Sequence, residues 1–406
     1  MKFSDPEEAV SLTAEIRATE RNSWKNWAYF YGSVFFFMAN LFAVIATFPA
    51  YSLSIGSTPF QSGLQNTVFG LSAVIFRLVL GPVMDQKGAK PLMLFGAFTF
   101  ATTPLIVMLG STYWLLLFAR IYQALGLAVF LPGISTMVAE LAPAKRLGTY
   151  LGSLRIFFNL GLLVGPATAI FLIDNYGYNS WFAVSAIVGA LSLLLLASVK
   201  PGERTITVTA MIGSLKNYAE ALQVKVLYPI IVGIALLSTI YSAIISFTAL
   251  HIKEPAAGAT AAHFFMIFGV AGIIGALSAG ALSDRVDRSR IAWPLMFFLG
   301  LGTILFAFID LHPALVIICA IILGISTQGS SLVFAAWLLD LAKPGLRATT
   351  VSIQENTIDI FFAFGALFFG LAAQGPGLSS AFLTVGLIII FSIMPLGLIT
   401  KKLSAF

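Results

Sequence analysis

The chain has very few cysteine and charged residues. Its 406 residues include one cysteine, Cys319, and only 10% are charged, compared with about 25% in typical soluble domains. A single thiol cannot form an internal disulfide, so we expect no disulfide framework. Because 59% of the residues are hydrophobic and so few are charged, the composition excludes a soluble domain and predicts an integral membrane protein.

Signatures of catalysis are also scarce. The sequence contains no G-x-x-x-x-G-K-[ST] loop, which argues against ATP hydrolysis as the energy source. The three histidines, His251, His263 and His312, do not have the spacing of metal ligands. No nucleophile and base form a recognisable motif. We therefore predict that the protein is not an enzyme and needs no metal or other cofactor.

Apolar segments of about 20 residues, the length of a bilayer-spanning helix, follow one another along the chain. They predict an all-α membrane protein with twelve transmembrane helices in two pseudo-symmetric six-helix bundles. We expect a cytoplasmic segment at 1–26, bundles at 27–199 and 227–406, and a cytoplasmic linker at 200–226. The expected spans are 27–52, 62–84, 91–109, 113–141, 149–173, 180–199, 227–250, 261–283, 291–309, 313–341, 348–373 and 380–399.

Basic residues are confined to alternate loops. All but four of the 23 Lys and Arg residues, namely Lys253, Arg77, Arg120 and Arg155, fall in stretches that lie on one side of the membrane if twelve segments cross it. Short basic loops stay in the cytoplasm, so both termini are expected there, most simply in a prokaryotic inner membrane. Since the basic residues are scattered, we expect no nucleic-acid partner, and the protein is expected to work as a monomer in the bilayer.

The two halves of the chain resemble each other at a spacing of about 200 residues. The segment from Gly81 to Asp85, GPVMD, is echoed by GALSD from Gly280 to Asp284. Internal repeats of this kind predict two related bundles around a central cavity. Such bundles can rock against each other and expose one site to either side of the membrane in turn.

The repeated segment resembles the signature G-x-L-x-D-R-x-G-R-R of major facilitator superfamily transporters, and the resemblance extends over nearly the whole chain. The copy in the loop expected at 81–90 keeps Gly81 and Asp85, whereas the copy at 280–288 is a closer match. The resemblance implies that the glycine allows close packing and that Asp85 caps the expected eleventh helix as a cytoplasmic latch. The implied gating residues of the second copy are Gly280, Asp284 and Arg285. A tight charged loop without a gating role is the alternative.

A second resemblance lies in the expected fourth helix. The segment from Arg120 to Gly126, RIYQALG, resembles the family motif R-x-x-Q-G-x-G. An arginine about 10 Å along a spanning helix is too costly to face lipid, so it must face protein or a cavity. The resemblance links Arg120 to proton coupling and brings Gln123 into the same site. The alternative is an arginine that snorkels to the outer interface or bonds helix carbonyls.

The expected fifth helix carries Gly152, Gly161, Gly165 and Pro166, which resemble the antiporter motif G-x8-G-x3-G-P-x2-G-G. Small residues on one stripe allow close contact with a neighbouring helix, and the proline permits a bend. This motif occurs in exporters more than in importers. The resemblance therefore favours export and adds Gly161, Gly165 and Pro166 to the expected gating residues.

Charged residues inside the expected spans are candidates for coupling. Counted at about 1.5 Å per residue, Arg77 and Glu355 lie equally deep, so we predict an ion pair between the halves that forms in one state and breaks in the other. A static pair is the alternative. Asp359 lies one turn deeper with no basic residue expected at its level, and it is expected either to carry a proton or to hydrogen-bond a neighbour. The repeat places Arg155 and Asn159 at the positions of Glu355 and Asp359.

Several polar residues are expected to face the cavity, where each is either a ligand contact or packing: Asn40, Gln65, Asn66, Tyr241 and Gln328. Exporters of cationic drugs often have an acid in the first helix, but this chain has Asn40 there. The sequence thus predicts a proton-coupled secondary transporter that exports a small zwitterionic or anionic organic solute by alternating access. The alternatives are an importer or facilitator of a small anion and a solute sensor that does not transport.

Overall fold

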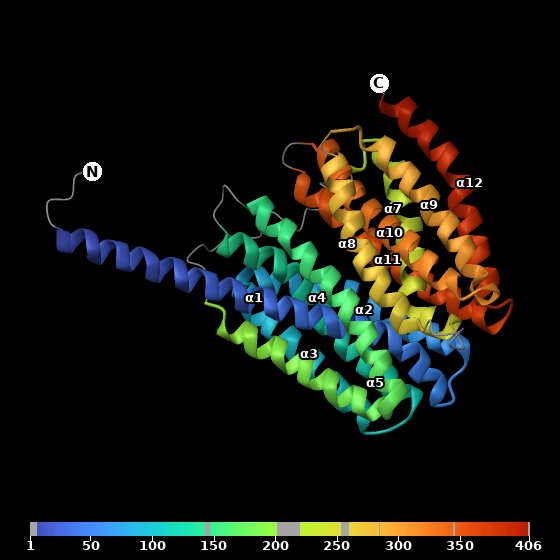
Figure 1. Cartoon of the computed structure of the whole chain (residues 1–406), viewed down its shortest axis with the longest axis horizontal. Coiled ribbons are helices and arrows are strands. Elements are labelled where there is room, and N and C mark those ends of the chain that lie inside the picture. The colour runs from blue at the N-terminus through green and yellow to red at the C-terminus, as the bar shows by residue number, and fades with distance from the viewer. Residues whose placement is uncertain are drawn as a thin grey trace.

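The computed structural model describes residues 6–142, 147–200, 220–252, 260–283, 285–343 and 346–404, and every regular element in these ranges is helical. Figure 1 shows the arrangement. The helices are α1 (Pro6–Ser54), α2 (Pro59–Lys87), α3 (Ala89–Met108), α4 (Tyr113–Leu141), α5 (Leu147–Ser198), α7 (Leu227–His251), α8 (Ala261–Ser283), α9 (Ser289–Ala307), the short 3-10 helix η3 (Ile309–Leu311), α10 (Ala314–Leu341), α11 (Arg347–Gln374) and α12 (Leu378–Ser404).

Eleven helices in the described ranges are long and apolar enough to cross a membrane. The apolar part of α5, Ile156–Ser198, has 43 residues, about twice the length of one crossing. Gly177 interrupts α5 with φ 79°, and Gly377 has φ 91° in the turn between α11 and α12. Positive φ favours glycine because it has no Cβ. A glycine therefore breaks the helical path at corresponding places of the two repeats.

The contacts of α1 show that the chain reverses at this break. In the first part of α5, Phe157 stacks on Tyr31 and Gly161 lies against Met38, so later residues meet later residues of α1. In the second part the order is inverted, because Ser185 bonds Asn40 and Ser192 bonds Ser33. The two parts of α5 thus run in opposite directions along α1.

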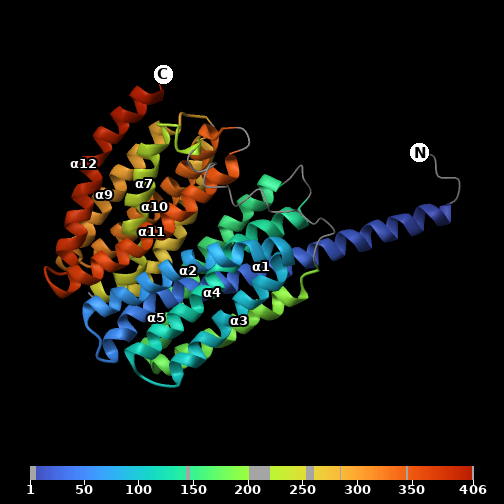
Figure 2. The same cartoon turned by 180° about the vertical axis from the view of Figure 1, so that it is seen from behind.

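The end of α2 differs from the sequence prediction, whereas the expected cytoplasmic segment stays a prediction. α1 is one helix of 49 residues, and its beginning extends away from the other helices (Figure 2). The expected loop at 81–90 is wrong, since α2 continues to Lys87 and α3 begins at Ala89. Gly88, with φ 82°, makes the whole turn. Gly81 and Asp85 therefore lie within α2.

Two groups of helices form the molecule. Among the amino-terminal helices, α1 packs on α5, α3 on α4 and α2 on α4. Among the carboxy-terminal helices, α8 packs on α10, α9 on α12 and α7 on α11. The groups meet where α2 packs on α11, α5 on α8 and α1 on α7, and both views show them side by side (Figures 1 and 2).

A close approach between the groups is the contact of α2 with α11, near the start of α2 and the end of α11. A Cβ on Gly63 would meet the carbonyl oxygen of Ala366 and lie 2.8 Å from Cα of Gly370. Four residues further along α2, the Thr67 hydroxyl donates to the carbonyl oxygen of Ala363 over 3.0 Å. We call these five residues the α2–α11 contact. Here the two backbones touch, as small residues allow between membrane helices.

This geometry predicts that Gly63→Ala destabilises the protein. The added methyl group has rigid backbone on the facing helix, so the helices must move apart, at a cost of about 1–3 kcal/mol of unfolding free energy. The midpoint of thermal unfolding in detergent measures the effect. Gly397→Ala on α12 is the control, because its Cβ would lie 3.8 Å from Trp293 in ordinary contact. Equal midpoints for the two variants would contradict the prediction.

Candidate functional site

Arg120 on α4 is the centre of a wholly buried polar cluster. Its side chain is 0% exposed, so it does not snorkel to an interface. Its Nη1 donates to Oε1 of Gln123 over 2.5 Å, and its Nη2 donates to Oδ1 of Asn66 over 2.7 Å. Both partners are neutral, and no ion pair involves Arg120 in the described part of the chain. The arginine is thus held without a counter-charge.

Aromatic rings supply the rest of the surroundings of Arg120. The guanidinium carbon lies 3.8 Å from the ring centre of Phe69 and 5.4 Å from that of Phe48. A cation over a desolvated ring gains about 2 kcal/mol, which offsets only part of the cost of burying a charge. Among the described residues, Nε of Arg120 and Nε2 of Gln123 also have no hydrogen-bond partner. We call Arg120, Gln123, Asn66, Phe48 and Phe69 the Arg120 cluster.

Asn66 extends this cluster to other helices. Its Nδ2 donates to the carbonyl oxygen of Ile45 on α1 over 3.2 Å and to Oγ of Ser246 on α7 over 3.0 Å. The sequence prediction named Asn66 only as a polar residue facing the cavity. Its bond to Arg120 depends on α2 lying against α4, which no motif in either helix reveals.

An ion pair does join the two groups of helices, but not the predicted one. Nη1 of Arg77 on α2 donates to Oδ2 of Asp359 on α11 over 2.5 Å, so the partner is Asp359 and not Glu355. The expectation that Asp359 has no basic residue at its level is therefore wrong. Both side chains are about one fifth exposed, at 21% and 18%.

The direction of helical side chains explains this error. Side chains on a helix point toward its N-terminus, and α2 and α11 run in opposite directions, because Gly63 faces Gly370 and Gly70 faces Ala363. The backbone near Gly70 lies level with Asp359, because a Cβ there would be 3.9 Å from the Asp359 carbonyl oxygen. The long side chain of Arg77 reaches from its own level back toward Gly70. Counting Cα positions alone therefore placed Arg77 one turn away from its true partner.

Other expected site residues are spread over the interface or lie outside the described side chains. Asn159 and Gln328 line a cavity of about 10 Å³ together with Ala276, Ser331 and Leu332, between α5, α8 and α10. The Tyr241 ring lies 6.3 Å from that of Phe362. Glu355 is exposed on α11, one turn from Asp359. The side chains of Arg155 and Asp85, the surroundings of Gly81 and the whole of Asp284 lie outside the described part.

The remaining candidates take part in helix packing. Asn40 exchanges hydrogen bonds with Ser185, so its amide is occupied by contact with α5. Gly161 and Gly165 lie against Met38 and Ala39 of α1, which is the close contact that their spacing predicts. Pro166 continues the same helix. These residues position α5 on α1, while any role in gating stays a prediction.

The second signature copy begins in the last turn of α8, and its described residues from Arg285 to Arg288 lead into α9. Gly280 faces Leu332 of α10, and the Arg285 side chain is exposed. Three residues after Arg285, Nε of Arg288 donates to Oδ2 of Asp340 over 2.8 Å, which joins this segment to α10. The hydroxyl and backbone NH of Ser289 donate to the Asp287 carboxylate and lower its pKa.

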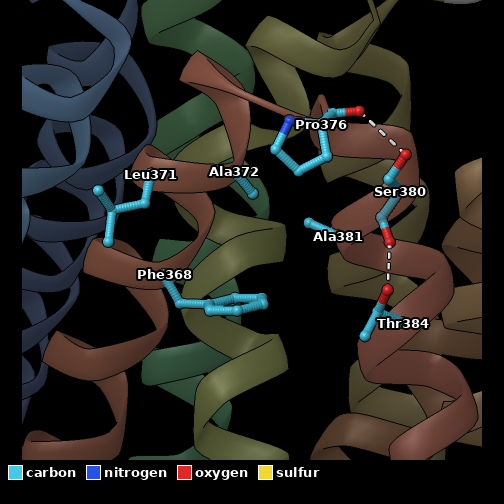
Figure 3. Close-up of a pocket in the computed structure, with 7 residues that line it drawn as sticks. All are labelled: Phe368, Leu371, Ala372, Pro376, Ser380, Ala381 and Thr384. Atoms are coloured by element: carbon cyan, nitrogen blue, oxygen red, sulfur yellow. Dashed lines mark hydrogen bonds between the residues drawn. The ribbon is translucent and has the colours of Figure 1, made fainter.

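A cavity of about 330 Å³ between α11 and α12 is a poor candidate site (Figure 3). Its seven lining residues include no charged side chain. The Ser380 hydroxyl donates to the Pro376 carbonyl oxygen over 2.9 Å, and the Thr384 hydroxyl donates to the Ser380 carbonyl oxygen over 2.8 Å. Each hydroxyl bonds the backbone carbonyl four residues earlier in the chain, and the walls present mainly apolar groups. The cavity offers no group that could couple ions to solute.

Comparison of the sequence with known proteins gives a match to one family model and matches to two relatives. A family model described as Major Facilitator Superfamily matches residues 30–332. The chain is 23% identical to the multidrug resistance protein MdtG of Enterobacter lignolyticus over 376 residues, which cover 90% of each protein. It is 22% identical over 165 residues to the quinolone resistance protein NorA of Staphylococcus aureus, which covers 41% of this chain and 42% of NorA.

Two solved structures of transporters show the same fold at low sequence identity. A bacterial homologue of the human lysosomal transporter Spinster, in an inward-facing and unoccupied conformation, has a TM-score of 0.76 at 15% identity and covers 95% of this chain and 98% of its own. The nucleoside transporter NupG has a TM-score of 0.71 at 15% identity and covers 95% of this chain and 99% of its own. These values show a common fold.

The Arg77–Asp359 pair predicts a measurable loss of stability in Asp359→Asn. Removing one partner leaves the Arg77 charge largely buried, so we expect a loss of about 2 kcal/mol of unfolding free energy, less than the 3–5 kcal/mol of a fully buried pair. Thermal unfolding in detergent measures it, and Arg77→Gln/Asp359→Asn should recover part of the loss.

Asp340→Asn is the matched control for this variant. It also breaks an arginine–aspartate pair, but Asp340 is 55% exposed, and an exposed pair contributes at most about 1 kcal/mol. If Asp359→Asn is no less stable than Asp340→Asn, then the ion pair between α2 and α11 does not stabilise this state.

Proposed function

The chain belongs to the major facilitator superfamily, and from that premise we propose that it is a proton-coupled exporter of a small zwitterionic or anionic organic solute. Membership of the family supports the general statement that the protein is a transporter. The protein is an integral membrane transporter of small molecules and not an enzyme. Proton coupling, export and the charge of the solute are the proposal.

The observation that carries proton coupling is the Arg77–Asp359 ion pair. It joins α2 to α11, and therefore the two groups of helices that alternating access must separate. While Asp359 is ionised, the pair favours the α2–α11 contact. A proton on Asp359 removes its charge and leaves Arg77 without a counter-ion, which weakens that contact. Proton binding and helix separation are then linked through one carboxyl group.

The same pair favours a zwitterionic solute. A cationic group of the solute and a proton compete for the Asp359 carboxylate, and such competition produces exchange of one for the other. An anionic group of the same solute would find Arg77 nearby, at 2.5 Å from Asp359 in the structure. A zwitterion can therefore insert between the two side chains and replace both partners. An anionic solute would use Arg77 alone, with Asp359 neutralised by a proton.

Topology and direction form part of the proposal. We take α5 as two crossings that turn at Gly177, which gives twelve crossings in two six-helix bundles with both termini in the cytoplasm of a prokaryotic cell, acting as a monomer. The reversal along α1 and the matching Gly377 turn support this arrangement. The α2–α11 contact then lies at the outer end, in line with the inward-facing conformation of the Spinster homologue. Export is favoured by the glycine stripe on α5 and by the resistance proteins among the relatives.

An importer or facilitator of small anions is the second candidate. Its support is Arg120, a buried cation whose bonding partners are neutral. An anion facilitator would move its solute without protons. A sensor that binds a solute without moving it is the third candidate, and it would show no solute flux at all.

The decisive experiment measures proton and solute movement together in proteoliposomes that contain a trapped pH indicator. The solutes are a fluoroquinolone as zwitterion, benzoate as organic anion and ethidium as cation. We expect the fluoroquinolone to move in exchange for protons, and Asp359→Asn to abolish the proton movement because its amide cannot take up a proton at neutral pH.

Asp340→Asn, which removes an exposed carboxylate, should retain exchange at the wild-type rate. Benzoate flux without proton movement in both the wild type and Asp359→Asn would establish the facilitator instead. Absence of flux for all three solutes, with binding retained, would establish the sensor.

A further inference from the structure

The hydrogen-bond partners of Asn66 determine which way its side-chain amide is turned, with the oxygen on one side and the nitrogen on the other. Arginine has only donors, so the atom that faces Arg120 must be the amide oxygen. A backbone carbonyl has only acceptors, so the atom that faces Ile45 must be the amide nitrogen. The observed bonds, 2.7 Å to Nη2 of Arg120 and 3.2 Å to the oxygen of Ile45, fit this assignment. The second hydrogen of the nitrogen then points to Ser246.

Among the described residues that bond Asn66, Ser246 belongs to the carboxy-terminal helices. Arg120 and Ile45 lie on α4 and α1, within the amino-terminal group, whereas Ser246 lies on α7. Asn66, Ser246 and Arg120 are all 0% exposed, so water does not replace these bonds while the helices stay together. A chain of hydrogen bonds from Arg120 through Asn66 to Ser246 therefore connects the buried guanidinium to the surface at which the two groups of helices meet.

We propose that Asn66 couples closure of the outer end of the transporter to the position of the Arg120 guanidinium. When α7 lies against α2, Ser246 completes the bonds of the amide, and the amide oxygen stays on Arg120. When α7 moves away, one amide hydrogen loses its acceptor, and the amide is free to turn toward water or solute. Arg120 then loses its fixed acceptor and offers Nη2 as well as the unpaired Nε.

This inference rests on the proposed alternating access, and it adds a residue and a path that the Arg77–Asp359 pair does not supply. Asn66 lies next to Thr67, whose hydroxyl belongs to the α2–α11 contact. The same short piece of α2 therefore touches both α7 and α11 of the facing group. Asn66 acts as a positioning residue, because it works through Arg120.

The test is a double-mutant cycle on the closing equilibrium, which needs no transported solute. Spin labels at Ser54→Cys and Gln374→Cys, both exposed at the outer end, report open and closed populations by pulsed electron resonance in nanodiscs. Cys319 is buried and does not interfere. The populations are compared in the wild type, Arg120→Lys, Ser246→Ala and the double variant.

Arg120 and Ser246 share only Asn66, so we expect their effects on the closed-to-open ratio to be non-additive by about fivefold, the equilibrium factor of one ordinary hydrogen bond. The non-additivity should vanish in an Asn66→Ala background. Ser242→Ala is the matched control, because Ser242 is an equally buried serine one turn away on α7, and its hydroxyl has no partner among the described residues. It should be additive with Arg120→Lys.

Each other outcome overturns a specific statement. Additive effects of Arg120→Lys and Ser246→Ala would refute coupling through Asn66 and leave the proposed transport intact. A single label distance in the wild type from pH 5 to pH 8, with and without a fluoroquinolone, would refute alternating access and this inference with it. If Arg120→Lys does not fold, Gln123→Ala replaces it, because Gln123 also bonds Arg120 and not Asn66.

Discussion

The contact of α2 with α11 is the constraint on which the arrangement of the two groups depends. Lipid tails are as apolar as leucine, so the hydrophobic effect does not press membrane helices together, and close packing and polar bonds must do so. Along α2, Gly63 supplies close packing, Thr67 a hydrogen bond and Arg77 an ion pair. One interface thus combines close backbone packing, a neutral hydrogen bond and an ion pair.

Much of the fold could be predicted from apolar length, but its boundaries could not. Most expected spans agree with observed helices to within a few residues, because about 20 apolar residues have few alternatives in a bilayer. An exception arises where polar residues are helical, from Asp85 to Lys87 at the end of α2. Polarity indicates solvent exposure and not the end of a helix. Gly88 ends α2 through its backbone conformation, which composition does not reveal.

The candidate site was predictable residue by residue but not pair by pair. The cost of an unpaired charge in lipid identified Arg120, Arg77 and Asp359 as buried candidates. Partnership depends on which helices adjoin and on the direction of each side chain, and both are tertiary facts. Counting the depth of each residue along its own helix therefore assigned Glu355 to Arg77. The same limit applies to Asn66, whose bond to Arg120 joins positions 54 residues apart.

The pairing of α1 with the second part of α5 has a consequence for biosynthesis. Asn26 exchanges hydrogen bonds with Lys200, 174 residues later, and Ser33 does so with Ser192, 159 residues later. A ribosome makes these partners many seconds apart, at about 5–20 residues per second. The Ser33 hydroxyl therefore lacks its partner until the second part of α5 has been made. The packing of α1 can be completed only after the other amino-terminal helices have been synthesised.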